Sequence, residues 1–398
     1  MAIDTPARIA IIGAGPIGIE TALYARFLGY DVDLFERGRI AEHVWQRGSV
    51  RWYTPWSANV SPLGVAALAG QAPDWRPLAD DALAMGEELV ARYWQPLAES
   101  DLVVDHLHLH TEVTYLARTH LIKQELLDDP ARGDEDFLIL TRNREGGEKL
   151  FTADAVIDCS GVIGNHRWAG QGGMPALGEM PLSAEIEYGV IDSRDASTTA
   201  RYAGKRVLLI GGGHTAATNA LVLGSLSPRP QVTWMTRREP LASANGPIDR
   251  MANDPLVERD RIAQQANALV SDPQSGIVHW SGTQLASIAR AESGGYHCEL
   301  VGDHAGAIDV DQIVASVGSR PDPRLTSELQ VEFDRATEGL PNVATNVLTT
   351  EPNFYIIGAK SFGRDPRFTV SEGLRQIRQV FAIIGDRENL DLYRTIKA

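Results

Sequence analysis

Short runs of apolar residues recur along the chain and predict strands that are buried on both faces. The first two runs cover residues 8–12 and 32–35, and later ones cover 154–161, 205–210, 231–235, 313–318 and 353–358. Between the first two runs, apolar residues at helical spacing predict a helix that turns Ile19, Ala22, Leu23, Phe27 and Leu28 toward a sheet and ends at Gly29. Helical spacing also covers residues 81–99 and 369–385. Buried strands that alternate with helices predict an α/β fold with parallel sheets.

A glycine-rich turn follows the first predicted strand. Gly13, Gly15 and Gly18 form the pattern G-x-G-x-x-G, with Pro16 and Ile17 inside it. In this pattern the first glycine allows a tight turn, the second lets backbone N–H groups approach a diphosphate, and the third lets the helix pack on the strand. Glu36 ends the next strand, 23 residues after Gly13 (36 − 13 = 23), close to the spacing of about 20 for an acid that binds a ribose 2′-OH. The order strand, glycines, helix, strand, acid predicts a dinucleotide site, and an ordinary glycine-rich turn is the alternative.

The same arrangement recurs 198 residues later (211 − 13 = 198). Gly211, Gly213 and Ala216 form G-x-G-x-x-A, with His214 and Thr215 inside the motif. The next strand ends in Arg237 and Arg238 where the first repeat has its acid. Guanidinium groups bind the 2′-phosphate of NADPH, which a carboxylate would repel. The motif therefore favours NADPH over NADH, unless both arginines belong to a solvated loop.

An aromatic segment follows Glu36. Between residues 45 and 56 lie Trp45, Trp52, Trp56 and Tyr53, together with two arginines. We interpret this segment as a loop that covers a flat cofactor and lines a substrate pocket with Trp52, Tyr53 and Trp56. Aromatic side chains that simply pack on the core are the alternative.

Three histidines, His106, His108 and His110, alternate in sequence, so a single strand would place them on one face. Neither a carboxylate nor a cysteine is placed to complete a metal site with them, and the polar face of an edge strand is the favoured interpretation, with no metal expected. Residues 137–141 and 149–152 alternate around a Gly-Gly turn and predict a hairpin.

Composition narrows the function further. The chain has 398 residues, enough for two domains, and a net charge of −15, which argues against nucleic acid or an anionic membrane as a partner. Two cysteines, Cys159 and Cys298, stand far apart, so the chain has no C-x-x-C dithiol. Neither a signal peptide nor an apolar run of membrane-spanning length is visible, and we expect a soluble, cytoplasmic protein.

The last predicted helix starts with Thr369-Val370-Ser371-Glu372, a capping-box pattern. It is either a plain amphipathic helix or one whose positive N-terminal end lies against a group that becomes anionic, such as a reduced flavin.

Together these motifs resemble the flavoproteins with two dinucleotide-binding domains: thioredoxin-reductase-like enzymes and class B flavin monooxygenases of the pyridine nucleotide-disulfide oxidoreductase superfamily. The resemblance includes the strand ends V-I-D-C-S-G and A-S-V-G-S-R-P and the run F-Y-I-I-G-A. It implies an α/β fold of two Rossmann-like FAD/NAD(P)-binding domains, with the NADPH domain inserted into the FAD domain. The expected domains are residues 1–170 and 321–398 for FAD, and 171–320 for NADPH.

The resemblance also implies roles for individual residues. FAD would be held by the first glycine motif and by further residues of the outer domain: Gly13, Gly15, Pro16, Ile17, Gly18, Glu36, Arg37, Trp45, Arg51, Val113, Gly161, Gly358, Ala359, Gly363 and Val370. NADPH would be held by the second motif and the arginines: Gly211, Gly213, His214, Thr215, Ala216, Arg237 and Arg238. Arg51 and Lys360 are candidates for stabilising a peroxide or an anionic substrate.

The sequence departs from the family at three places. Gly358-Ala359 replaces the usual Gly-Asp, the C-x-x-C is absent, and Gly161, His166 and Trp168 have the residue types but not the spacing of the class B fingerprint. Because the chain has no dithiol, reduced flavin needs O₂ or a small organic molecule as its acceptor, and we expect an NADPH-dependent flavin monooxygenase that transfers oxygen from O₂ to a small molecule. The alternatives are a reductase that passes electrons to a ferredoxin-like or quinone acceptor and a flavin redox sensor without turnover. The number of subunits is left open, with a homodimer as one option.

Overall fold

The computed structural model describes residues 3, 5–241 and 245–395. These residues divide into two compact units. Unit 1 takes its residues from 1–45, 54–165 and 320–398, and unit 2 takes its residues from 46–53 and 166–319. The short segment 46–53 thus belongs to unit 2, although the chain on both sides of it belongs to unit 1. Across the described residues, no helix combines the length and apolar character that crossing a bilayer requires.

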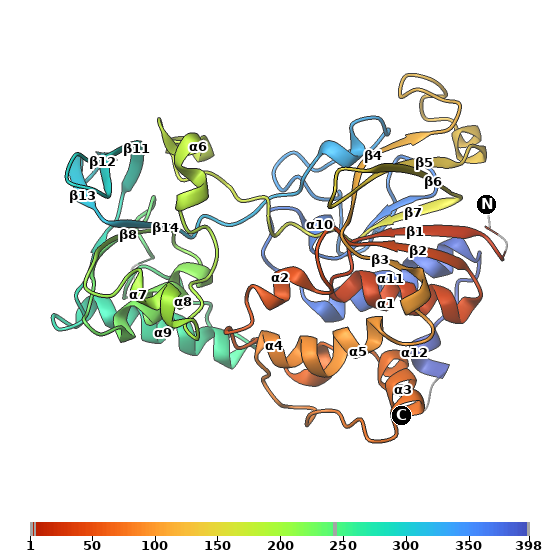
Figure 1. Cartoon of the computed structure of the whole chain (residues 1–398), viewed down its shortest axis with the longest axis horizontal. Coiled ribbons are helices and arrows are strands. Elements are labelled where there is room, and N and C mark those ends of the chain that lie inside the picture. Colours follow the sequence, from red (N-terminus) through yellow and green to blue (C-terminus); the bar gives the residue numbers. More distant parts are fainter. Residues whose placement is uncertain (1–2, 4, 242–244, 396–398) are drawn as a thin grey trace. The chain divides into compact units, whose positions relative to one another are not determined.

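Unit 1 is built on a parallel sheet with the strand order β15-β7-β1-β2-β3 (Figure 1). Its strands are β1 (Arg8–Ile12), β2 (Asp31–Phe35), β3 (Leu107–His108), β7 (Ala155–Asp158) and β15 (Phe354–Ile356). All the pairings are parallel, and β1 lies between β2 and β7. The apolar runs predicted as buried strands are confirmed here, since β7 and β15 are buried along their whole length.

Two helices cover one face of this sheet. They are α1 (Pro16–Leu28) and α11 (Val370–Ile384), and Tyr24 of α1 stacks on Phe381 of α11 with ring centroids 5.1 Å apart. Gly29 ends α1 in the left-handed conformation, as predicted. The prediction that Phe27 faces the sheet is wrong, because this residue is 47% exposed on the outer side of the helix.

A three-stranded antiparallel sheet covers the other face. It consists of β4 (Thr111–Arg118), β5 (Phe137–Asn143) and β6 (Glu148–Ala153), and it confirms the predicted hairpin. Apolar side chains of both sheets form one buried cluster that includes Ile12, Phe137 and Ile356. Unit 1 is therefore layered as helices, parallel sheet and antiparallel sheet (Figure 1).

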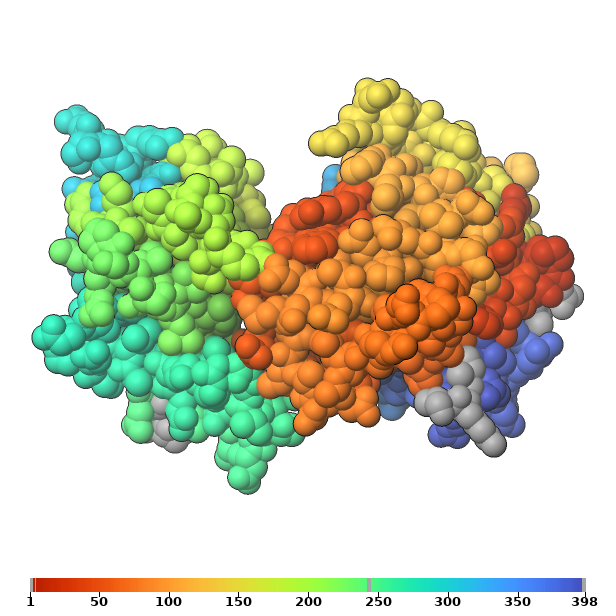
Figure 2. Space-filling model, turned by 60° about the horizontal axis from the view of Figure 1, so that its bottom comes forward, coloured from red at the N-terminus to blue at the C-terminus, as the bar shows by residue number. Residues whose placement is uncertain are grey.

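Short helical segments between residues 56 and 98 form a further part of unit 1, seen in orange in Figure 2. They are a 3₁₀ turn (Trp56–Ala58), α3 (Pro62–Gln71), α4 (Gly86–Leu89), a π-helical turn (Val90–Trp94) and α5 (Gln95–Ala98). The predicted helix over 81–99 exists only from residue 86, because the Glu88 carboxylate accepts the N–H of Met85 and caps the helix there. The remaining helices of unit 1 are α2 (Glu42–Trp45), α10 (Ala359–Phe362) and α12 (Leu392–Thr395).

The expectation that three alternating histidines share one strand is wrong. His106 ends a 3₁₀ turn, His108 ends the two-residue strand β3, and His110 has a left-handed backbone with φ 53°. His108 Nε2 instead lies 2.6 Å from a carboxylate oxygen of Asp33 on β2. In the part of the chain that the structure describes, no group of side chains is arranged to hold a metal ion.

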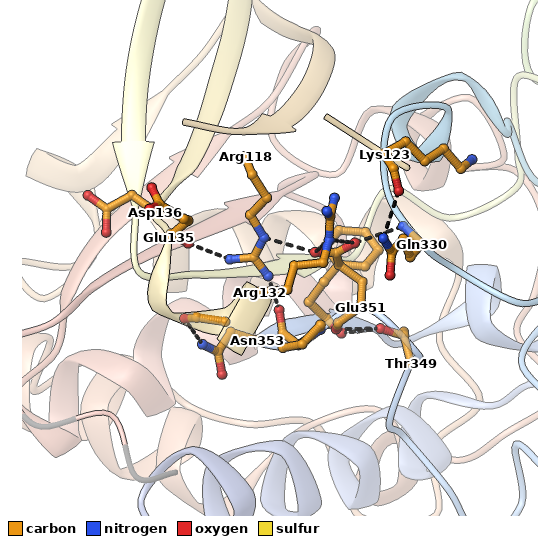
Figure 3. A network of polar contacts seen from close by, with 12 residues as sticks. Arg118, Lys123, Arg132, Glu135, Asp136, Gln330, Thr349, Glu351 and Asn353 are labelled. Atoms are coloured by element: carbon orange, nitrogen blue, oxygen red, sulfur yellow. Dashed lines mark hydrogen bonds and ion pairs between the residues drawn. The ribbon is translucent and has the colours of Figure 1, made fainter. Parts of the chain in front are cut away.

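A buried ion-pair network fixes the loops of unit 1 (Figure 3). Glu351 Oε1 accepts hydrogen bonds from Arg118 Nε (2.8 Å) and Arg132 Nε (2.9 Å), and Glu351 Oε2 accepts the N–H of Gln330 at 2.7 Å. All three charged side chains are fully buried. Because Glu351 lies shortly before β15 and Arg118 ends β4, the network ties the parallel sheet to the antiparallel sheet.

Unit 2 repeats this plan. Its parallel sheet has the order β10-β9-β8-β14, with β8 (Arg206–Ile210), β9 (Gln231–Met235), β10 (Ile277–Trp280) and β14 (Gln312–Ala315). One face packs on α8 (His214–Ser225) and α9 (Val257–Ser271), and the other on an antiparallel sheet of β11 (Thr283–Arg290), β12 (Tyr296–Gly302) and β13 (Gly306–Val310). Two short helices, α6 (Glu179–Leu182) and α7 (Ala196–Ala200), complete the unit. The predicted α/β fold with Rossmann-like parallel sheets is confirmed.

Candidate functional site

The first glycine turn lies at the carboxyl end of β1. Gly13 has φ +99°, and a Cβ there would lie 2.9 Å from the carbonyl oxygen of Cys159. A Cβ at Gly18 would lie 1.8 Å from the carbonyl oxygen of Gly13, so neither position accepts a side chain. A Cβ at Gly15, in contrast, would meet no atom within 4 Å. The turn is therefore packed at its two ends and open at its middle glycine.

This open position lies at the N-terminus of α1, whose first turn starts with Pro16. Unpaired N–H groups and the helix dipole make such a terminus attractive to a diphosphate. Glu36 lies beside the turn, since its Oε2 accepts the N–H of Ala14 at 2.9 Å and its Oε1 accepts that of Gly38 at 2.7 Å. Burial raises the pKa of Glu36, and these two hydrogen bonds oppose the rise. The carboxylate is thus held in a fixed orientation at the end of β2.

Other residues predicted at the FAD site lie around the same sheet edge. The carbonyl oxygen of Glu36 accepts the N–H of Thr111 at 2.8 Å, which places the start of β4, and Val113 two residues later, next to the β2 end. Arg37 is exposed, with Nη2 3.4 Å from His43 Nε2. Gly161 follows β7 with φ +71°.

The first turn of α1 also meets the C-terminal part of unit 1. A Cβ built at Gly358 would lie 3.5 Å from Ile17, and one built at Gly373 would lie 2.3 Å from its Cδ1 atom. The helix α11 begins at the buried Val370, and its Gln376 side chain accepts the N–H of Gly358 at 2.8 Å. The glycine turn, the β15 end and α11 thus converge. The contact made by Gln376 was not predicted, since a lone glutamine in a helix carries no sequence signal.

Lys360 has a different role from the predicted one. Its side chain is 1% exposed, and Nζ donates to Asp158 Oδ2 at 2.6 Å and to Ser160 Oγ at 3.2 Å. The predicted role, stabilising a peroxide or an anionic substrate, needs an accessible ammonium group, and this one is enclosed and already neutralised by a carboxylate. Its neighbour Ala359 begins α10, and Gly363 ends that helix with φ +64°. The ion pair therefore joins α10 to the end of β7, so this part of the prediction is corrected.

The second glycine turn repeats the geometry of the first. Gly211 has φ +132°, and a Cβ there would lie 2.3 Å from the carbonyl oxygen of Ser316. A Cβ at Gly213 would meet no atom within 4 Å, and Ala216 is fully buried under the first turn of α8. The indole N–H of Trp234 on β9 donates to the carbonyl oxygen of Gly211 at 2.8 Å, a support that the sequence pattern does not reveal.

The residues expected to select the dinucleotide lie on the same edge of unit 2. Thr215 is the second residue of α8. Arg237 and Arg238 follow β9 after one intervening residue, Thr236, and both arginines are exposed. The Thr236 hydroxyl donates to the carbonyl oxygen of Arg238 at 3.0 Å and so shapes the turn that carries both guanidinium groups.

The aromatic segment is divided between the two units. Trp45 ends α2 in unit 1, with the Arg39 guanidinium 5.3 Å from its ring centroid. Arg51, Trp52 and Tyr53 belong to unit 2. The hydrogen bond from Arg261 lowers the pKa of Glu258 on α9, and the charge of Arg51 adds to this effect. Trp56 is a core residue of unit 1, 1% exposed. Trp56 thus follows the alternative interpretation, in which the aromatic side chains pack on the core. Its ring lies edge-on to that of Tyr93, with ring centroids 5.8 Å apart.

Both cysteines are buried, and they lie in different units. Burial raises the thiol pKa of Cys159 well above its usual value and that of Cys298 to about 12. Neither thiol therefore resembles the low-pKa, accessible cysteine that redox catalysis uses.

Comparisons with known proteins agree with this architecture. No family model matches the chain. A curated relative, ferredoxin–NADP reductase 1 of Cupriavidus necator, is 27% identical over 275 residues, which are 68% of this chain. The match spans 64% of the length of that relative.

Solved structures cover almost the whole chain at low identity. The bacillithiol disulfide reductase of Bacillus cereus has a TM-score of 0.71 at 16% identity, with 96% of this chain and 99% of that chain covered. The cadaverine monooxygenase DfoA of Erwinia amylovora, solved with FAD, has a TM-score of 0.64 at 14% identity, with 97% and 96% covered. The ornithine N-hydroxylase of Kutzneria sp. 744, solved with reduced FAD and NADP⁺, has a TM-score of 0.63 at 14% identity, with 96% and 100% covered.

The cofactors named for these proteins, FAD and NADP, agree with those expected from the two glycine motifs. The chain therefore has the same two-domain α/β fold as these solved structures, as its sequence predicts.

Proposed function

We propose that the protein is an FAD-dependent oxidoreductase that takes its electrons from NADPH. One observation carries the proposal: each unit has a glycine turn at the carboxyl end of a parallel sheet, closed at its first glycine and open at its second. Such a turn fits a dinucleotide diphosphate. Two of them in one chain fit a flavin dinucleotide and a nicotinamide dinucleotide.

The chain's own residues would bind and orient these groups. In unit 1 the N-terminus of α1 would hold the FAD diphosphate, and Glu36 would accept hydrogen bonds from the adenosine ribose. In unit 2 the N-terminus of α8 would hold the NADPH diphosphate, and Arg237 and Arg238 would bind the 2′-phosphate. Once bound, FAD would accept a hydride from NADPH and pass the electrons to an acceptor.

Our first proposal for the acceptor is O₂, used by a flavin monooxygenase that oxidises a small organic molecule. Two buried cysteines in different units support a route without a dithiol. The two N-hydroxylating monooxygenases among the structural neighbours also support this choice. The proposed substrate is a small nucleophilic compound.

Our second proposal is an electron-transfer reductase with a ferredoxin-like or quinone acceptor. The curated relative supports it, since its name is that of a ferredoxin–NADP reductase and it matches 275 residues. The two proposals share both cofactor sites and differ in what reoxidises the flavin.

Flavin absorbance separates these alternatives. The purified protein, loaded with FAD, is reduced anaerobically with NADPH and then mixed with O₂ in a stopped-flow instrument. A transient band that matches neither oxidised nor reduced flavin supports the monooxygenase. Slow reoxidation by O₂, together with fast reoxidation by ferredoxin or a quinone, supports the reductase. Protein that binds no FAD, or FAD that NADPH does not reduce, refutes both.

A further inference from the structure

His214 is the first residue of α8, so its side chain leaves the helix beside the second glycine turn. The preceding Gly213 is the N-cap, and its open side faces no protein atom within 4 Å. Under the proposed function, on which this inference rests, the diphosphate of NADPH would approach this turn. A histidine at this position can add a titratable donor to the backbone N–H groups.

Tyr53 packs against this histidine. The two ring centroids are 6.0 Å apart, and the rings meet edge to face at 62°. Burial raises the pKa of the Tyr53 hydroxyl, and the side chain of Thr218, one helical turn further along α8, opposes the rise. The Thr218 hydroxyl in turn donates to the carbonyl oxygen of His214 at 3.0 Å. Tyr53 therefore lies beside the start of α8, and its ring restricts the orientation of the imidazole.

Burial, together with the charge of Arg259, disfavours the protonation of His214 before a ligand arrives. Burial, followed by the positive charge of Arg259 on α9, holds the pKa of His214 below its usual value. Asp254 and Asp260 act in the opposite direction. Each of them is already engaged, because Asp254 pairs with Arg259 at 2.6 Å and Asp260 pairs with Arg250 at 2.7 Å. In the ligand-free protein the imidazole is therefore mostly neutral at pH 7.

A dinucleotide would reverse this balance, since its diphosphate brings negative charge to the turn that carries the imidazole. We propose that His214 is a proton-dependent ligand of the dinucleotide phosphates, and that Tyr53 is the residue that positions its ring. The imidazole takes one proton from solvent as the dinucleotide binds, and no covalent bond changes. The affinity for NADPH would then depend on pH through the imidazole of His214, in addition to the contacts made by the glycine turn and the two arginines.

Isothermal titration calorimetry of NADP⁺ with the FAD-loaded protein tests the proposal. Measurement in two buffers of different ionisation enthalpy, at pH 6.5 and pH 8.5, gives the number of protons taken up. We expect greater uptake in the wild type than in His214→Gln at pH 6.5, and no difference at pH 8.5. The Kd for NADP⁺ should rise about fivefold to tenfold in His214→Gln at pH 6.5, equivalent to a pKa shift of about one unit on binding. The 2′-phosphate of NADP⁺ also takes up protons, but its contribution is the same in the wild type and in His214→Gln. It therefore cancels in the difference between the two proteins.

Two further variants refine the test. His297→Gln is the matched control, because His297 lies on β12 beside Asp309 and should leave proton uptake unchanged. Tyr53→Leu removes the aromatic ring that contacts His214, so it should weaken NADP⁺ binding at pH 6.5 more than at pH 8.5. Should His214→Gln not fold, an NMR titration of the wild-type imidazole with and without NADP⁺ replaces it, with a higher pKa expected in the complex.

The outcomes separate this inference from the proposed function. A protein that binds no NADP⁺ at either pH refutes the NADPH site itself. Tight NADP⁺ binding with equal proton uptake in the wild type and in His214→Gln leaves the NADPH site standing and overturns the role of His214.

Discussion

Replacing Glu20 by Gln should stabilise the protein at high pH. Glu20 lies on α1 and is fully buried. Its Oε1 accepts hydrogen bonds from the Tyr93 hydroxyl at 2.5 Å and from the N–H of Ser61 at 3.3 Å, while Oε2 has no partner among the described residues. Burial raises the pKa of Glu20 from 4.5 to about 7, and the hydrogen bonds from Tyr93 and Ser61 reduce that rise. A carboxylate at this position therefore destabilises the folded protein whenever it is charged.

The size of the effect follows from the shift. Between pH 4.5 and 7 the folded protein holds a proton on Glu20 that the unfolded chain has released, so the free energy of unfolding falls as pH rises through this window. A shift of about 2.5 pH units corresponds to a loss of about 3 kcal/mol, reached in full above pH 7. Glutamine keeps the shape and the acceptor for Tyr93 but carries no charge. Glu20→Gln should thus gain roughly 1–3 kcal/mol over the wild type at pH 8.5 and almost nothing at pH 5.

Thermal unfolding of the wild type and of Glu20→Gln at pH 5, 7 and 8.5 checks this reasoning. The melting temperature of the variant should exceed that of the wild type by several degrees at pH 7 and at pH 8.5, and hardly at all at pH 5. Glu145→Gln, a change in an exposed turn, is the control that should show no such pH dependence. A difference between Glu20→Gln and the wild type that is the same at all three pH values would contradict the assignment of the charge to Glu20.

Four further variants test other parts of the structure. Glu351→Ala should lower the free energy of unfolding by roughly 3–5 kcal/mol in chemical denaturation, because it leaves two buried guanidinium groups without their carboxylate. Gly15→Ala should fold, since its Cβ meets no protein atom, but it should raise the Kd for FAD at least about tenfold in a fluorescence titration. Gly18→Ala should fail to fold, because its Cβ would lie 1.8 Å from the carbonyl oxygen of Gly13. Replacing Arg237 and Arg238 by Gln should raise the Kd for NADPH about tenfold to hundredfold, and the Kd for NADH less than about twofold. Equal increases of the two Kd values would show that the two arginines do not bind the 2′-phosphate.

The parts of the fold that depend on backbone geometry could be predicted from the sequence. Gly13 and Gly211 stand where the backbone has a positive φ and the neighbouring strand passes too closely for a Cβ, so the glycine itself reveals the turn. The N-cap of α11 could be predicted for a similar reason, because the Thr369 side chain accepts the N–H of Glu372 within one turn of the chain. Local signals of this kind need no knowledge of distant residues.

The parts that depend on long-range pairing could not be predicted. The partner of Lys360, Asp158, is 202 residues away, so nothing in the sequence indicates that the two pair. Without that pairing, the sequence presents Lys360 as a cation available to bind an anion. Trp56 and Tyr53 are three residues apart, yet one lies in the core of unit 1 and the other beside α8 of unit 2. No periodicity in so short a segment can indicate that the chain passes from one unit to the other.

The contact of β15 with β7 has a consequence for how the protein is made on the ribosome. Phe354 follows Asp158 by 196 residues (354 − 158 = 196), and unit 2 takes most of its residues from this interval. At a synthesis rate of roughly 5–20 residues per second, the edge of β7 waits about 10–40 s for its neighbouring strand. Asp158 waits for the Lys360 ammonium over the same period. The newly made chain therefore completes unit 2 before it can close unit 1, and shielding the open edge of β7 during that interval is a task for chaperones or for the nascent unit itself.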